Sequence, residues 1–502
     1  MPRYVLVNRR AGKFTDDAKR SSRGAVASAL TMLRSTDVIF DHQPKDETAR
    51  RVVVLDADET EIRSIRENLP QDAILEPAVQ RQLHRHTPIK LRPTLPMPAT
   101  TAGAVHPLYS VTVKGGGAPL ANIEVMFYFD HLGQTHVDTK KTDSQGRVSV
   151  AVPSGFTLSL VEPIPYADFW IMLVKPPASG GTIDCAPVAK ADAHGTGWWH
   201  GAMKIKATDP NRGAGIKVGV IDTGCGPHPN LAHVTLVGAF IDGEQLPPNQ
   251  GYDVAEHGTH TSGIIGARPS KAGDYAGLAP GCELFHARVF KDESPQGGPS
   301  QAEIIMAIDA LSRDHQCDLI NMSLGGGPPT QSEEDAIRDA EERGTLCICS
   351  AGNDAGAIEY PGAYQECAAV SAIGQRDWAP ANTFSAGNLP NDPEMIGKNN
   401  LFLAAFSCYG PTLACAGPGV GIVSTVPARP PAAPAPYMEM DGTSMASPAA
   451  CGALAVILSQ DAQYKSLPRD KPRAKRARTL LANHCQTIGL DDQYQGKGVP
   501  AV

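Results

Sequence analysis

The chain has 502 residues and a formal net charge of −8, and a length of this size suggests about two to four domains. Its 42% hydrophobic and 20% charged residues are typical of a folded globular protein and exclude an extended disordered chain. The sequence has no uninterrupted apolar run of about 18 residues, so it predicts no membrane span, and its start is too charged for a signal-peptide core. We therefore expect a cytoplasmic protein, with non-classical export as the alternative.

Charge divides unevenly along the chain. Residues 1–95 hold 17 Lys and Arg against 13 Asp and Glu, so the remaining residues carry a net charge of −12. Opposite charge would help the first segment to dock on the rest of the chain, although ordinary solvated charge explains these counts equally well. A weakly basic head on an acidic body does not favour nucleic acid as a partner.

The 11 cysteines all lie between Cys185 and Cys485, and no two of them form a CxxC pair. An odd number without paired spacing predicts neither a disulfide framework nor a zinc ribbon. We expect reduced thiols, most of them packed in the core.

The first segment, residues 1–93, alternates short apolar strands with helix-compatible stretches. Its pattern predicts a small α+β domain with strands over residues 4–8, 51–55 and 73–79 and helices over residues 15–33 and 59–68. A proline-rich run follows and predicts an extended linker over residues 94–107.

Residues 108–176 show short alternating strands separated by turns such as Asp143-Ser-Gln-Gly146. This pattern predicts a small β-sandwich. The Pro-, Gly- and Ser-rich stretch that begins at Lys175 predicts a second linker over residues 177–194.

The longest segment, residues 195–502, alternates near-continuous apolar strands with helical stretches. Strands buried on both faces and joined by helices predict an α/β domain built on a parallel sheet. Sheets of this kind carry their functional groups at strand ends and helix starts. The clearest strands cover residues 216–221, 284–290, 319–322 and 346–350, and the clearest helices cover residues 300–313, 331–343 and 444–460.

Three motifs at such positions point to one chemistry. They are Val218-Gly-Val-Ile-Asp222-Thr-Gly, Glu256-His257-Gly-Thr-His260 and Asp441-Gly-Thr-Ser444-Met-Ala-Ser-Pro. In this chain order the segments resemble those of the subtilisin-like (subtilase) serine peptidases, where Asp, His and Ser follow one another. The resemblance covers about residues 195–502 and implies a parallel-sheet subtilisin-like peptidase fold.

The resemblance implies a role for each residue of this set. Ser444 would be the nucleophile, His257 the base that takes its proton, and Asp222 the carboxylate that orients the imidazole and stabilises its cation. Asn353, in the segment Ser350-Ala-Gly-Asn353, would provide one oxyanion donor and the Ser444 backbone N–H the other. Each residue alone is more often a cap or turn residue, and the four together favour catalysis.

The resemblance also implies an edge at which the substrate binds. Ser323, Leu324 and Gly325 match the family segment that pairs with substrate as an added strand. The loop near Gly297 and Gly298 would flank the other side of the substrate.

The primary specificity pocket is expected to be acidic. Alignment with the family puts Glu359 at the base of this pocket and Asp354 at its rim. Two carboxylates there favour Lys or Arg before the scissile bond, because a cationic side chain pairs with a carboxylate that is otherwise costly to bury. The alternative is that Glu359 points to solvent or pairs internally with an arginine.

The head resembles the inhibitory propeptide of the same family, most clearly at Val52-Val-Val-Leu-Asp-Ala-Asp58 and Ile74-Leu-Glu-Pro77. This implies that the N-terminal domain is an intramolecular inhibitor whose tail, residues 79–86, runs through the active site. Because the tail contains two arginines that suit an acidic pocket, we expect self-cleavage near Arg81 or Arg85. A permanently attached regulatory domain is the alternative.

The remaining features suggest partners rather than further chemistry. The β-sandwich is similar to small transthyretin-like modules, which implies a spacer or a binding site for a protein partner. The loop over residues 268–275 carries two cationic residues and one carboxylate, unlike a calcium site, and no HExxH pattern is present, so we expect no metal and no cofactor.

We interpret the chain as a serine endopeptidase that hydrolyses protein or peptide substrates through an acyl-enzyme. A non-catalytic binding protein of the same fold and a dedicated processing protease are the alternatives.

Overall fold

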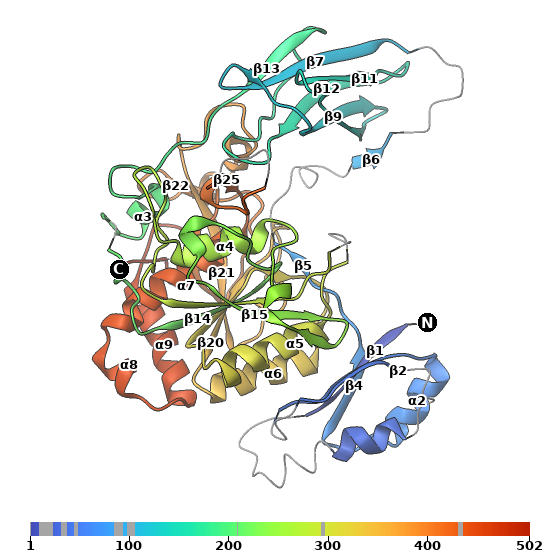
Figure 1. Ribbon diagram of the computed structural model, residues 1–502, viewed down its shortest axis with the longest axis vertical. Coiled ribbons are helices and arrows are strands. Elements are labelled where there is room, and N and C mark those ends of the chain that lie inside the picture. Colours follow the sequence, from blue (N-terminus) through green and yellow to red (C-terminus); the bar gives the residue numbers. More distant parts are fainter. Residues whose placement is uncertain are drawn as a thin grey trace.

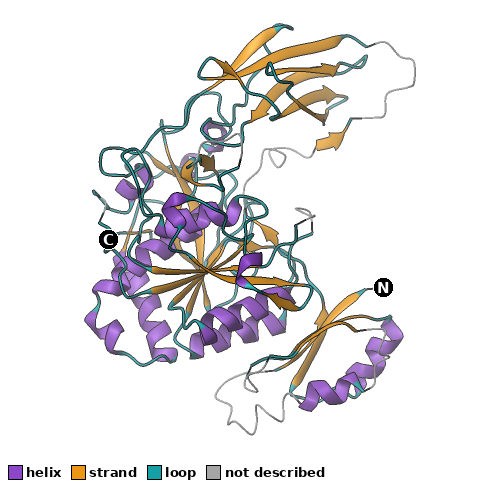
Figure 2. Cartoon of the chain, in the orientation of Figure 1, coloured by secondary structure: helices purple, strands orange, loops and turns teal. Residues whose placement is uncertain are grey.

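The computed structural model describes residues 2–9, 24–31, 38–44, 49–84, 94–97, 106–207, 209–292, 297–429 and 435–502. Figure 1 shows three parts, namely an N-terminal α+β unit, a two-sheet β unit and a large α/β domain that lies between them. Helices flank the central sheet of the large domain, whereas the β unit is built of strands and loops (Figure 2). None of the helices in these ranges combines the length and the hydropathy that a membrane crossing requires.

The N-terminal unit is a four-stranded antiparallel sheet with helices on one face (Figure 1). Its strand order is β2-β3-β1-β4, and a capping box at Asp58 fixes the start of its helix α2. Of the helix expected over residues 15–33, the structure describes residues 24–31, and residues 24–30 are helical. The named elements are β1 (Arg3–Asn8), β2 (Val38–His42), β3 (Val52–Asp56), α2 (Glu59–Glu67) and β4 (Ala73–Pro77).

The open face of this sheet packs on the large domain. It meets the helices α5 (Gln301–Asp309) and α6 (Gln331–Glu342), and both sides share one buried apolar cluster. Alternation along the strands sends one set of side chains to the helix-covered face and the other set to this interface. The strand residues in the shared cluster are Val5, Val7, Val52 and Val54.

The β unit consists of two packed sheets with strand orders β12-β9-β10-β6 and β11-β7-β13, the small strand β8 pairing with β7. The strands β6 and β13 come from residues whose composition favours linkers, and both are edge strands that pair in parallel with β10 and β7. The strands are β6 (Thr94–Pro96), β7 (Leu108–Gly115), β8 (Ala118–Pro119), β9 (Glu124–His131), β10 (Gln134–Lys141), β11 (Arg147–Ala151), β12 (Thr157–Ile164) and β13 (Gly181–Cys185).

A buried carboxyl group lies on β12. The side chain of Glu162 is fully buried, and the Tyr128 hydroxyl donates a hydrogen bond to its Oε2 at 2.6 Å. Its Oε1 has no hydrogen-bond partner among the described residues. Burial raises the pKa of Glu162 to about 8, although the hydrogen bond from Tyr128 favours the charged form. The group is therefore neutral in the folded chain at pH 7.

We expect Glu162→Gln to raise Tm more at pH 8 than at pH 5. In the unfolded chain this carboxyl titrates near about 4.3, so from there to about pH 8 only the folded state holds the proton, and folding stability falls as pH rises. Glutamine keeps an acceptor for the Tyr128 hydroxyl and cannot ionise, so it removes this loss, a gain on the order of 4 kcal/mol at pH 8. Thermal denaturation at both pH values measures it, with the exposed Glu124→Gln as control. Equal changes in Tm at the two pH values would contradict the raised pKa of Glu162 in the folded chain.

The large domain is built on a nine-stranded sheet whose path runs β16-β15-β17-β14-β18-β20-β21-β22, with β23 also paired to β21. Its pairings are parallel except for the antiparallel edge strands β16 and β22. The strands are β14 (Lys217–Asp222), β15 (Thr235–Ile241), β16 (Glu244–Leu246), β17 (Glu283–Arg288), β18 (Leu319–Met322), β20 (Leu346–Ser350), β21 (Cys367–Gln375), β22 (Leu401–Leu403) and β23 (Leu413–Pro418).

Helices cover both faces of this sheet. The helices α5 and α6 share a core with the N-terminal unit on one face, and α4 and α7 share a second core on the other. The remaining helices are α3 (Trp198–Ala202), α4 (His257–Gly266), α7 (Thr443–Gln460), α8 (Ala462–Ser466), α9 (Lys471–His484) and α10 (Asp492–Gln495), with short 3-10 or π turns η2 (Pro229–Leu231), η3 (Pro248–Gln250), η4 (Ala310–Asp314), η5 (Ser385–Asn388) and η6 (Pro393–Met395).

Several two-stranded ladders complete the fold. Among them, the pair β5–β19 joins the N-terminal tail to the large domain. The strands are β5 (Gln82–Leu83), β19 (Leu324–Gly325), β24 (Ile422–Thr425), β25 (Tyr437–Met440), β26 (Cys485–Gln486) and β27 (Val499–Pro500).

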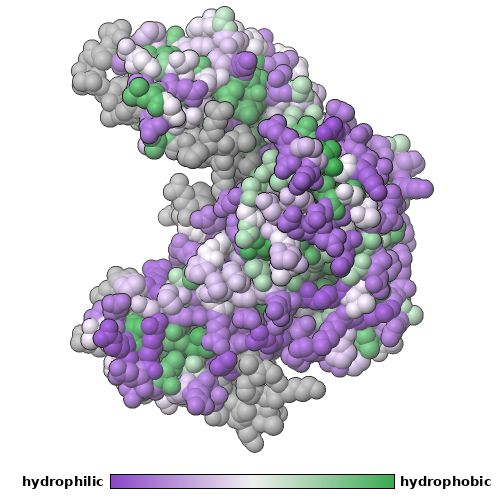
Figure 3. Space-filling view, turned by 180° about the vertical axis from the view of Figure 1, so that it is seen from behind, coloured by the Kyte–Doolittle hydropathy of each residue, from purple (hydrophilic) through white to green (hydrophobic). Residues whose placement is uncertain are grey.

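The β unit docks on the large domain through aromatic and backbone contacts. Trp378 lies edge-on to both Trp170 and Trp199, with ring centroids 6.4 Å and 5.9 Å apart. The Ile171 N–H donates to Glu439 Oε1 at 2.6 Å, and the Tyr166 hydroxyl donates to the Pro427 carbonyl at 2.7 Å. Figure 3 shows the N-terminal unit and the β unit projecting on the same side of a mostly hydrophilic large domain.

Candidate active site

The three predicted triad residues lie at the end of one strand and at the starts of two helices. Asp222 ends β14, His257 begins α4, and Ser444 is the second residue of α7. His257 Nδ1 lies 2.7 Å from Asp222 Oδ1, and both side chains are fully buried. His257 Nε2 is buried without a hydrogen-bond partner among the described residues, so this nitrogen is available to accept a proton.

The surroundings of Asp222 keep it ionised. Its Oδ1 accepts the Thr223 N–H at 2.7 Å, and its Oδ2 accepts the Thr261 hydroxyl at 3.2 Å. Burial opposes the charge, but the facing His257 and its hydrogen bond hold the pKa of the Asp222 carboxyl below the ordinary value. The carboxylate can therefore orient the imidazole and stabilise its cation.

His286 is a buried neighbour that the sequence did not single out. It lies on β17 opposite Val220 of β14, and burial lowers its pKa to about 4. Its Nε2 accepts the Gly224 N–H at 3.2 Å, and its Nδ1 lies 2.9 Å from the Ser262 hydroxyl. A neutral ring there fixes the backbone just after Asp222 without adding a second cation to the site.

Ser444 is held by a reciprocal pair of hydrogen bonds with Ser323. The Ser444 hydroxyl donates to the Ser323 carbonyl at 3.0 Å, and the Ser323 hydroxyl donates to the Ser444 carbonyl at 2.8 Å. Pro448 lies inside α7 and has no N–H, so the Ser444 carbonyl lacks its usual helical donor and Ser323 replaces it. The sequence predicts a substrate-binding role for the Ser323 segment, and the contact of the Ser323 side chain appears only in the structure.

Two donors converge on one carbonyl oxygen beside Ser444. The Asn353 side-chain amide and the Ser444 backbone N–H both donate to the carbonyl of His84, the latter at 3.3 Å. The orientation of Asn353 is fixed because its Oδ1 accepts the Thr443 N–H at 3.0 Å and the Thr443 hydroxyl at 2.8 Å. Thr443 was missed although it lies inside the serine motif. Two donors that converge on one carbonyl oxygen are the arrangement that an oxyanion hole requires.

We expect Asn353→Ala to lower kcat by about 10²–10³-fold with little change in KM, because the amide stabilises charge that develops only in the transition state. Steady-state hydrolysis of a peptide substrate measures both constants. The exposed Asn391→Ala is the matched control and keeps the wild-type kcat. A loss that appears only in KM would contradict the assigned role.

The N-terminal tail enters this site as an added strand. β5 pairs antiparallel with β19, matching Gln82 with Gly325, and the tail's other edge is held by the Arg81 N–H, which donates to the Pro299 carbonyl at 2.9 Å. A Cβ on Gly298 would lie 1.6 Å from the Arg81 carbonyl oxygen, so only glycine allows this approach. Both strand-binding segments that the sequence indicated thus contact the tail.

The side chain of His84 fills the pocket assigned to specificity. Its Nδ1 lies 2.6 Å from the Ser350 hydroxyl, and its Nε2 lies 2.8 Å from Glu359 Oε2. The structure therefore places Glu359 in contact with a side chain of the tail, whereas Asp354 is exposed. The tail residue beside Glu359 is His84 and not Arg81, and Arg85 lies outside the described residues.

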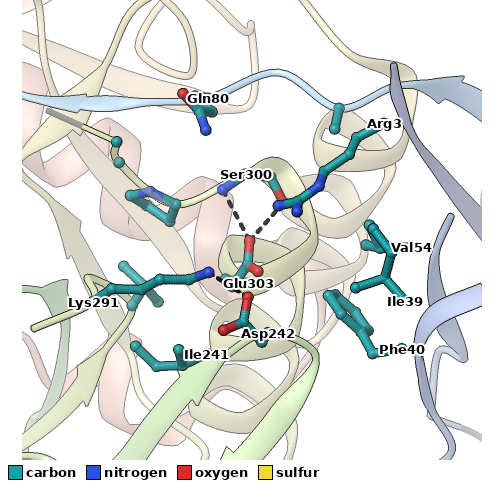
Figure 4. Close-up of a pocket in the computed structure, with 15 residues that line it drawn as sticks. Arg3, Ile39, Phe40, Val54, Gln80, Ile241, Asp242, Lys291, Ser300 and Glu303 are labelled. Carbon is teal, nitrogen blue, oxygen red and sulfur yellow. Dashed lines mark hydrogen bonds and ion pairs between the residues drawn. The ribbon is translucent and has the colours of Figure 1, made fainter. Parts of the chain in front are cut away.

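A pocket of about 410 Å³ lies beside Ala78 and Gln80, which precede the tail residues at the triad (Figure 4). Its lining comes from both the N-terminal unit, with Arg3 and Phe40, and the large domain, with Lys291 and Glu303. Glu303 accepts the Ser300 N–H at 2.9 Å and belongs to the capping box of α5. The pocket therefore lies at the interface between the N-terminal unit and the large domain.

Charged side chains of the loop at residues 268–275 form hydrogen bonds with other groups of the protein. The Arg268 guanidinium donates to the Pro280 carbonyl at 2.7 Å, and Asp274 Oδ2 accepts the Ser270 N–H at 3.2 Å. Across the described part of the chain, no group of three or more His, Cys, Asp or Glu residues is placed to hold a metal ion.

Comparison with known proteins agrees with this geometry. The family described as "Peptidase_S8: Subtilase family" matches residues 213–498. Subtilisin Savinase of Lederbergia lenta is 31% identical over 288 residues, which cover 57% of this chain and 89% of the relative. The major intracellular serine protease of Bacillus subtilis (strain 168) is 31% identical over 258 residues, covering 50% of this chain and 70% of the relative.

A solved structure shows a similar fold. The crystal structure of fervidolysin from Fervidobacterium pennivorans, described as a keratinolytic enzyme related to subtilisin, has a TM-score of 0.60 and 18% identity. The match covers 100% of this chain and 60% of fervidolysin. At this identity the likeness shows a subtilisin-like fold and nothing about substrate. The family match, the sequence relatives and the assembled triad together show that the chain belongs to the subtilase family of serine endopeptidases.

Proposed function

We propose that this protein is a self-inhibited endopeptidase that prefers a cationic side chain before the scissile bond and cleaves its own N-terminal segment. One observation carries the proposal. The carbonyl of His84 receives both oxyanion donors while its imidazole contacts Glu359. A residue held in this way occupies the position of the last substrate residue before a scissile bond, so the bond in question joins His84 to Arg85.

The reaction follows from the contacts around Ser444. Its hydroxyl turns from the Ser323 carbonyl toward His257 Nε2, which takes the proton as the oxygen bonds to the substrate carbonyl carbon. Asn353 and the Ser444 N–H hold the resulting oxyanion. His257 then gives the proton to the leaving amine, and water hydrolyses the acyl-enzyme by the same two steps.

The inhibitory role of the N-terminal unit is supported by its docking. The fully buried Arg50 lies 2.6 Å from Asp339 and 3.5 Å from Asp309, one carboxylate on each of the helices α6 and α5. Glu76 accepts the backbone N–H groups of Gln331 and Ser332 at 2.9 Å and 3.0 Å, so it caps the start of α6. These contacts support a docked unit whose tail occupies the substrate position and so blocks access of other chains.

Two further proposals rest on other features. The aromatic contact of Trp378 with Trp170 holds the β unit against the large domain, and we propose that this unit is a spacer or a binding site for a protein partner. The 11 cysteines are free thiols, which is compatible with a reducing, cytoplasmic location.

A series of peptides that differ only before the scissile bond tests the preference. We expect Lys, Arg or His at that position to give kcat/KM about 10-fold or more above Leu or Phe, and Glu359→Gln to remove the difference. Glu394→Gln, which changes an exposed carboxylate on a surface turn, serves as control. A preference for Leu or Phe in the wild type would overturn the cationic preference.

A further inference from the structure

A second side chain of the tail is buried in a pocket of its own. Arg81, three residues before His84, is fully buried, whereas its neighbour Gln82 is exposed. Long cationic side chains are almost never fully buried unless they are paired. The surroundings of Arg81 therefore have to compensate its charge.

All three nitrogens of the Arg81 guanidinium are engaged. Nε donates to Glu333 Oε1 at 3.2 Å, and Nη2 donates to Glu333 Oε2, which makes a two-point contact between guanidinium and carboxylate. Nη1 donates to the Gly326 carbonyl and, at 3.1 Å, to the Pro328 carbonyl. A lysine ammonium is a point charge and cannot match this fork of donors.

The groups that bind the Arg81 guanidinium all belong to the large domain. Glu333 lies in the first turn of α6, where the helix dipole favours a carboxylate, and its side chain is fully buried in the complex with the tail. The Tyr364 hydroxyl accepts the Thr330 N–H at 2.8 Å and lies 3.1 Å from Glu333 Oε2. Each of these hydrogen bonds of the guanidinium ends on an oxygen acceptor, and an apolar side chain would leave the buried carboxylate without its cation.

We propose that this pocket, with Glu333 as its determinant, selects an arginine three residues before the residue at the cleaved bond, in substrates as well as in the chain's own tail. The proposal rests on the endopeptidase function proposed above and adds a second specificity position to it. Gln82 lies between these two residues of the tail, Arg81 and His84, and its side chain is exposed. We therefore expect no selection for a particular side chain at that position.

The first test compares tail variants of the full-length protein by the rate at which a fluorophosphonate labels Ser444. We expect Arg81→Ala to be labelled at least about 10-fold faster than wild type, because a tail without its anchor leaves the site more often. Arg63→Ala makes the same change on the exposed face of α2 and is the control. Equal labelling rates for the wild type, Arg81→Ala and Arg63→Ala would overturn the anchoring role.

The second test measures kcat/KM of the full-length protein, per labelled active site, on peptides of sequence Arg-Gln-Leu-His-Arg and their analogues with Lys or Ala at the first position. We expect arginine to exceed alanine by about 10²-fold and to exceed lysine as well, and Glu333→Gln to reduce both ratios to near unity. Glu334→Gln, on the next residue of α6, is the control.

The outcomes separate the two proposals. Equal cleavage of the Arg and Ala peptides by an enzyme whose Ser444 is labelled would overturn the arginine pocket and leave the endopeptidase function standing. Absence of both labelling and cleavage would overturn the function and this inference with it. Glu333→Gln that keeps the wild-type Tm but loses the ratio supports the inference, since a merely structural role would lower Tm without changing selectivity.

Discussion

Ser444→Ala is expected to lower kcat for peptide hydrolysis by on the order of 10⁶-fold, the size measured for the equivalent change in subtilisin. The reason is that the Ser444 hydroxyl belongs to the same residue whose N–H is one of the two converging oxyanion donors. The Ser444 N–H and Asn353 hold the His84 carbonyl directly beside the Ser444 side chain. Without the hydroxyl, no acyl-enzyme can form, and only the oxyanion hole and substrate binding remain to accelerate hydrolysis.

The matched control for this variant is Ser459→Ala, at the other end of α7, where the hydroxyl donates to the Val456 carbonyl at 2.6 Å. We expect this control to keep the wild-type kcat. Fluorophosphonate labelling should be lost in Ser444→Ala alone. Residual hydrolysis within 10³-fold of the wild type would show that another nucleophile is used.

Asp222→Asn is expected to lower kcat by about 10⁴-fold. The geometry around residue 222 can survive the change, because Thr261 already lies 3.1 Å from the Gly258 carbonyl and can donate there while it accepts from the new amide. What is lost is the negative charge that faces His257 when the imidazole becomes a cation. The loss should therefore appear in kcat and only weakly in KM.

The control for Asp222→Asn is Asp318→Asn. Asp318 is also buried, at the opposite end of the sheet just before β18, and it pairs with Arg469 and Arg473 at 3.0 Å and 2.8 Å. We expect this variant to lose stability but to keep kcat per folded molecule. A similar fall in kcat for both variants would mean that the effect of Asp222 reflects folding rather than charge.

The catalytic residues could be predicted because each lies in a short motif at a defined place in the fold. Asp222, His257, Ser444 and Asn353 sit at a strand end, at helix starts and in a turn, and the parallel sheet brings these places to one edge. Their local sequences therefore carried enough information for both role and position.

The residues of the tail could not be assigned from sequence, because their roles depend on register. The pairing of Leu83 with Leu324 places His84 beside Glu359 and Arg81 beside Glu333. A shift of one residue would send different side chains into both pockets, and no periodicity in this short segment fixes that shift. The two arginines of the tail led instead to a predicted cleavage near Arg81 or Arg85.

Contacts between segments that lie far apart in the chain could not be predicted from the local sequence pattern either. Pro448 lies inside its helix, and its missing N–H is offset by the Ser323 hydroxyl more than a hundred residues away along the chain. Likewise, the edge strands β6 and β13 consist of residues rich in turn formers and pair only because neighbouring strands offer free edges. Such contacts arise from tertiary structure and not from local propensity.

Intact-mass spectrometry of the wild type beside Ser444→Ala tests self-cleavage by this active site, since it locates the bond that is cut. We expect the wild type to separate between His84 and Arg85, while Ser444→Ala keeps its full length. Cleavage of the wild type at another bond, an uncut wild type, or the same cleavage in Ser444→Ala would contradict this expectation.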